Sequence, residues 1–146
     1  MNAPSRIADR TADDLMAFRT VRAAMPCLAE GLSVEDLAAQ SMADCSPGKW
    51  HLAHTSWFFE TFILKPFAGD YEPLQPAYEI LFNSYYNTVG RQFPRAQRGL
   101  LSRPTVSQVL AYRQHIDNAM TRLLAAEDHP QLEAIIQRCR LGIEHE

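Results

Sequence analysis

Apolar side chains recur at helical spacing in four long segments of the chain, and no strand pattern competes with them. The segments run over Thr11–Glu30, Trp50–Leu64, Pro104–Glu127 and from Pro130 onward, with one shorter helical turn expected over Ser33–Gln40. Ser46 is the expected N-cap of the second helix, with Pro47 at its first position. The pattern predicts an all-α fold.

The lengths of the connections predict how these helices are arranged. The third and fourth helices are separated only by Asp128 and His129, so we expect antiparallel neighbours. Residues 65–103 separate the second and third helices, which is long enough to cross a bundle and let the two run parallel. The prediction is an up-down-down-up four-helix bundle, with a long crossover loop that its aromatic residues pack in place.

Composition narrows the class of protein. A chain of 146 residues with 47% hydrophobic and 21% charged residues suits one domain with a real core. The net charge of −3 gives no reason to expect binding to nucleic acid or to an anionic membrane. The three cysteines (Cys27, Cys45 and Cys139) are widely spaced and match neither a disulfide framework nor a zinc motif. We expect a cytoplasmic protein without a membrane span.

His54 is the first candidate for chemistry, because it falls near the middle of the apolar stripe of the second helix. A buried imidazole needs a hydrogen-bond partner or a metal. One interpretation is a core histidine paired with a carbonyl or carboxylate. The other is a metal ligand, whose partner would come from another helix: His115, His129, His145 or a carboxylate.

His145 and Glu146 form the second candidate. Extending the stripe of the fourth helix puts Ile143 inward and leaves His145 on a different face. Either Gly142 permits a change of helical phase, or Leu141 and His145 form a second seam. An ordinary solvated helix end is the alternative.

The third candidate is the arginine-rich end of the long loop, above all Arg95 and Arg98. A guanidinium binds a carboxylate through two parallel hydrogen bonds, so these residues are candidates for substrate binding. The alternative is ordinary surface arginine.

Four blocks in a fixed order resemble a known family. They are Lys49-Trp-His-Leu-Ala-His-Thr-Ser-Trp-Phe-Phe-Glu60, Leu81-Phe-Asn-Ser-Tyr-Tyr86, Arg95-Ala-Gln-Arg-Gly-Leu-Leu-Ser-Arg-Pro-Thr105 and Leu141-Gly-Ile-Glu-His-Glu146. The series resembles the N-terminal DinB-like domain of the ergothioneine-biosynthesis sulfoxide synthases. That resemblance implies Fe(II) held by three histidines, which joins the thiol of cysteine or γ-glutamylcysteine to hercynine with O₂ as oxidant. It implies His54 and His145 as iron ligands, and Arg95 and Arg98 as carboxylate-binding residues.

The chain also departs from the family pattern. The second histidine of the His-Glu-x-x-His motif would follow Glu146, where this sequence ends, and the C-terminal domain of sulfatase-modifying-factor type is missing. We therefore expect an incomplete domain, one half of a split enzyme or a fragment, with a weak two-histidine site completed by Glu146 or water. No catalytic residue is assigned.

Three alternatives remain open at this point. The chain is a paralogue acting on another histidine derivative or a selenium donor, a metal-dependent thiol transferase, or a non-catalytic bundle that serves as an interaction or assembly domain.

Overall fold

The computed structural model describes residues 3–146, with side chains from Thr11 onward; residues 1–2 lie outside the described residues. The described residues form helices and connections and contain no strand, which confirms the all-α prediction. The elements are α1 (Ala3–Leu28), α2 (Val34–Ala38), α3 (Gly48–Phe59), a π-helix (Glu60–Leu64), α4 (Lys65–Phe67), α5 (Tyr78–Leu81), a 3₁₀-helix (Arg95–Leu100), α6 (Val106–Leu124) and α7 (Leu132–His145).

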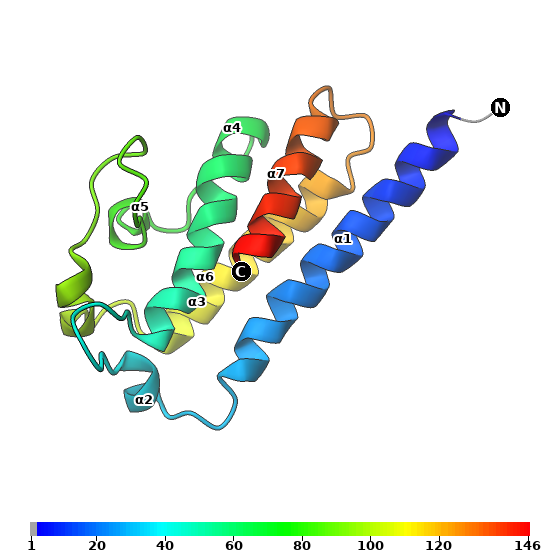
Figure 1. Ribbon diagram of the computed structural model, residues 1–146. Helices are drawn as coiled ribbons and strands as arrows, with labels where there is room; N and C mark the ends of the chain where they lie inside the picture. The colour runs from blue at the N-terminus through cyan, green and yellow to red at the C-terminus, as the bar shows by residue number, and fades with distance from the viewer. Residues whose placement is uncertain (1–2) are drawn as a thin grey trace.

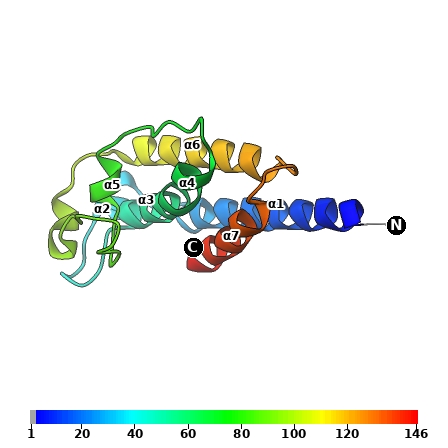
Figure 2. The same ribbon diagram turned by 90° about the horizontal axis from the view of Figure 1, so that it is seen from above.

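The long helices α1, α3, α6 and α7 pack around one core. Figure 1 shows α3 and α6 side by side and pointing the same way, with α1 and α7 running in the opposite direction. Seen from above, the N-terminal part of α1 extends beyond the other helices (Figure 2). The C-terminal end of α7 lies close to the middle of α3 (Figure 1), which brings residues far apart in sequence into one region.

Local sequence explains the starts of α2 and α6. Ser33 and Thr105 each accept a hydrogen bond from a backbone N–H in the first turn of the helix that follows, and each forms a capping box. The expected cap at Ser46 is wrong, because Pro47 occupies the N-cap position and makes no side-chain bond. The hydroxyl of Ser46 instead accepts a hydrogen bond from Nη1 of Arg98 at 2.8 Å. The Ser46 hydroxyl therefore binds the guanidinium of Arg98 and not a backbone N–H of α3.

Helix α3 continues without interruption through the π-helix into α4. Glu60 begins the π-helical segment, and its buried carboxylate accepts hydrogen bonds from the hydroxyls of Tyr71 and Tyr112. A π-turn inserts one residue into the α-helical period and shifts the phase of the side chains that follow. Accordingly, Ile63 and Leu64 are both fully buried. An unbroken α-helical period from Trp57 would put Thr61 inward, but it is only half-buried.

The core is rich in aromatic side chains. Its largest fully buried members are Trp57, Tyr112, Phe18, Phe59 and Phe82. The apolar pattern of the third predicted helix places Leu110 inward, but in α6 its side chain is 42% exposed. The buried face of α6 runs through Val109, Arg113 and Ile116, and the helical period of 3.6 residues puts Leu110 beside this face.

Helix α1 begins at Ala3, earlier than the Thr11 expected. The prediction followed the apolar residues from Leu15 onward, which mark where a helix packs and not where it begins. In the part of the chain that the structure describes, no helix has both the length and the apolar content needed to cross a membrane.

Candidate functional site

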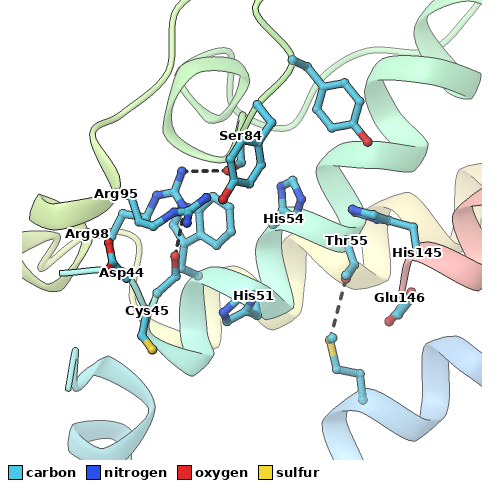
Figure 3. Close-up of a pocket in the computed structure, with 15 residues that line it drawn as sticks. Asp44, Cys45, His51, His54, Thr55, Ser84, Arg95, Arg98, His145 and Glu146 are labelled. Atoms are coloured by element: carbon cyan, nitrogen blue, oxygen red, sulfur yellow. Dashed lines mark hydrogen bonds between the residues drawn. The ribbon is translucent and has the colours of Figure 1, made fainter. Parts of the chain in front are cut away.

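A pocket of about 680 Å³ opens where α3, α7 and the long loop meet (Figure 3). Both histidines of the sequence prediction line it, as do both arginines. Figure 3 shows His54 and His145 facing one another, with Arg95 and Arg98 on the far side of His54. The structure therefore gathers the four predicted site residues in one cavity: His54, His145, Arg95 and Arg98.

His54 is held in one orientation by its surroundings. Its ring stacks on Trp50 with centroids 4.6 Å apart and on Trp57 with centroids 5.6 Å apart. Nδ1 lies 2.7 Å from the carbonyl oxygen of Phe82. A carbonyl only accepts, so Nδ1 carries the proton and Nε2 keeps its lone pair. This tautomer is the one that a metal-binding imidazole uses when its other nitrogen is anchored by a carbonyl.

The pKa of His54 favours the neutral ring. Burial is the largest cause that lowers the pKa to about 4; the nearby His145, His51 and Arg98 act in the same direction, and the hydrogen bond to the Phe82 carbonyl opposes them. At neutral pH the imidazole is uncharged, and an uncharged imidazole is the form that binds a metal.

His145 completes the pair. Its ring packs on Phe58 at 4.8 Å and lies 5.0 Å from the ring of His54, centroid to centroid, at an angle of 68°. Burial lowers its pKa, against the effect of the adjacent Glu146. Among the residues whose side chains the structure describes, none donates to or accepts from its buried Nδ1. A buried ring nitrogen without a partner is costly unless another group binds it.

The placement of His145 corrects the prediction about α7. The helix runs without a break through Gly142, so the expected change of phase does not occur. Leu141 is 58% exposed, so it forms no seam with His145. Gly142 instead faces α3, where an added Cβ would lie 2.5 Å from Cε1 of Phe59. The absence of a side chain lets α7 approach α3 and brings His145 to His54.

Two imidazoles at this separation fit one metal ion. Metal–nitrogen bonds of about 2 Å, with each ring centroid roughly 1 Å behind its nitrogen, put adjacent ligand rings about 4.5–5 Å apart. The separation of 5.0 Å agrees with this. Within residues 11–146, however, no three His, Cys, Asp or Glu side chains converge on one point. The described residues offer two ligands, not a complete set.

Glu146 does not complete the set. Its carboxylate, expected as a possible third donor, is bonded to Arg113 at 2.7 Å and to Arg22 at 2.9 Å. The other two histidine candidates also lie elsewhere. His115 and His129 line a second pocket, of about 560 Å³, where their Nε2 atoms donate to the carbonyls of Glu72 and Phe67.

The two arginines differ in exposure. Arg98 is buried, with its guanidinium 3.6 Å above the ring of Trp50, and it donates to Ser46, Ser84 and the carbonyl of Asn83. Burial first, and then Arg95, lowers its pKa to about 10, so it stays cationic at neutral pH. Arg95 is half-buried and stacks on Tyr85 at 4.4 Å. Arg98 therefore fixes the loop to α3, and Arg95 keeps a guanidinium facing the pocket.

Sequence reasoning gave no role to Arg22 and missed Arg113. The available signal was an arginine at an inward position of an amphipathic helix, since Arg113 shares the stripe of Val109 and Ile116. Such a position indicates a buried ion pair but does not identify its partner.

Comparison with known families gives one match. The model of the DinB superfamily matches residues 17–144, and the chain therefore belongs to this superfamily. The match spans the helices that carry His54, Arg113 and Gly142. A search of curated proteins gives no match.

Proposed function

We propose that this DinB-superfamily protein is the iron-binding domain of an O₂-dependent sulfoxide synthase of ergothioneine biosynthesis. The reaction joins the thiol of cysteine or γ-glutamylcysteine to hercynine. The observation that carries the proposal is the pair formed by His54 and His145, whose rings lie 5.0 Å apart in a pocket that also contains Arg95. The four ordered sequence blocks that resemble this family support the same function.

In this proposal His54 and His145 each offer a neutral imidazole to Fe(II). The Phe82 carbonyl keeps the proton on Nδ1 of His54, and the two tryptophan rings keep the imidazole from turning. Bound Fe(II) supplies a redox centre that activates O₂ toward a thiol.

The arginines hold the substrate. Arg95 presents a guanidinium to the carboxylate of the thiol substrate, and Arg98 adds positive charge from its buried position over Trp50. Fixing the carboxylate restricts where the sulfur can lie, which is catalysis by positioning.

The remaining parts of the reaction site come, in this proposal, from outside the described residues. A third imidazole and a covering domain of sulfatase-modifying-factor type complete the pocket, and we expect no useful turnover from the 146 residues alone. The helices form the up-down-down-up bundle of the family, and the protein works in the cytoplasm. A non-catalytic bundle for interaction or assembly is the second candidate, favoured by the lack of a third ligand within residues 11–146.

The test is product formation by a fusion of this chain to the C-terminal part of a sulfoxide synthase. We expect O₂-dependent sulfoxide from hercynine and cysteine or γ-glutamylcysteine. A His54→Ala fusion should lose it, and a His115→Ala fusion, altered at a histidine outside the pocket, should retain it. No sulfoxide from a folded, iron-loaded fusion would contradict the proposal. Product from another histidine derivative or a selenium donor alone would favour a paralogue.

A further inference from the structure

A buried ionic cluster lies at the end of α7, beside the histidine pair. Arg22 of α1 and Arg113 of α6 hold opposite oxygens of the Glu146 carboxylate, at 2.9 Å and 2.7 Å. The side chains of Arg22, Arg113 and Glu146 are exposed by only 2%, 4% and 1%. We name these three residues the Glu146 clamp.

Both arginines of the clamp are fixed independently of Glu146. Arg22 donates from Nε to Asp117 and from Nη2 to Ser56, each at 2.6 Å. Arg113 donates to the carbonyl of Leu52 and to the hydroxyl of Thr55, each at 2.9 Å. The two guanidinium groups therefore form a rigid receptor for the carboxylate, built from three helices.

The clamp fixes the last turn of α7 from one side, and Gly142 fixes it from the other. Gly142 packs against Phe59, Glu146 lies between α1 and α6, and His145 stands between these two contacts. His145 has no hydrogen bond at Nδ1 to any side chain or backbone group that the structure describes. Its direction therefore depends on the backbone and on the stack against Phe58.

We infer that Arg22, Arg113 and Glu146 are positioning residues that aim the ring of His145 at His54. The inference rests on the proposed function for the identity of the bound metal, but the ring geometry that it explains exists without metal. Removing the carboxylate leaves two buried guanidinium groups with Asp117 as their acidic partner among the side chains that the structure describes, and it removes the bonds that join Glu146 to α1 and α6.

The test compares Glu146→Gln with a matched control, Arg140→Gln, in the full 146-residue chain. Arg140 also joins α7 to α1, through Asp14 at 2.7 Å, but its side chain is 50% exposed and lies outside the pocket. NMR on the metal-free protein measures the ring contacts of His145 with Phe58 and His54, and Co(II) titration measures metal affinity. We expect Glu146→Gln to lose the contacts and to bind Co(II) at least about tenfold more weakly, with Arg140→Gln unchanged.

Unchanged ring contacts in Glu146→Gln would overturn the inference, and so would equal loss in both variants, which would indicate general docking of α7. If Glu146→Gln fails to fold, Arg22→Lys is the second variant. It keeps the positive charge but loses the planar guanidinium that bonds to Asp117, Ser56 and Glu146, so it should weaken the same ring contacts. If the unaltered chain binds no Co(II), the proposed function fails, while the ring contacts still decide the inference.

Discussion

At the scale of single residues, the surroundings of His54 fix both the orientation and the protonation state of its imidazole. Two tryptophan rings and a carbonyl hold the imidazole, and burial keeps it neutral. Because the neutral ring is favoured in the folded protein, protonation must oppose folding. Protonation of His54 therefore lowers the free energy of unfolding even in the metal-free protein.

We predict that the metal-free protein loses stability as the pH falls from about 6.5 toward 4. In this window the unfolded chain protonates His54 at its ordinary pKa of 6.5, whereas the folded chain does so only at about 4, so unfolding takes up a proton. The difference corresponds to about 3 kcal/mol. Urea unfolding at several pH values measures it. His54→Gln should flatten the dependence and His115→Gln should not; an identical profile in all three proteins would contradict this account.

At the scale of elements, the close packing of α7 on α3 depends on Gly142, which has no side chain. The apolar pattern identified the buried face of α7 from Leu132 to Cys139 but carried no signal at Gly142. Close approach of two helices depends on what the partner presents, here Phe59, which the sequence of α7 does not contain. The direction of His145 was therefore wrong, although its nearness to His54 was right.

We predict that Gly142→Ala separates α7 from α3. The new Cβ would lie 2.5 Å from Cε1 of Phe59 and 3.1 Å from Cδ1 of Phe58, and overpacking of this kind costs about 1–3 kcal/mol. Gly69→Ala is the control, because no atom lies within 4 Å of its Cβ position. Thermal unfolding compares the two variants. Equal melting temperatures for Gly142→Ala and the unaltered protein would show that the contact is not tight.

In other elements, too, contacts between residues near in sequence can be predicted, whereas contacts between distant residues cannot. In each capping box the two partners are close in sequence, Ser33 with Asp36 and Thr105 with Gln108, so such helix starts can be predicted. Ser46 has the same local signal, yet its hydroxyl bonds to Arg98, which lies in the long loop. The π-helix at Glu60 depends on Tyr71 and Tyr112, and no local pattern indicated it.

At the scale of the whole molecule, four helices meet where the histidines lie. Helix α3 provides His54, α7 provides His145, and α1 and α6 provide the two arginines that hold Glu146. The residue pattern made His54 a candidate with three histidines as possible partners, and the family resemblance selected His145 among them. The arginines that hold Glu146 could be recognised only when the helices were placed together. The long loop closes the pocket through Arg98 on Trp50.

The central claim is that His54 and His145 bind one Fe(II) ion together. The most direct measurement is a double-mutant cycle on anaerobic Fe(II) affinity, with His54→Ala, His145→Ala and the double variant. If both rings bind the same ion, each single change should weaken binding, and the second change should add far less in a chain that already lacks the first. Two fully additive losses, or full affinity in either single variant, would contradict the account.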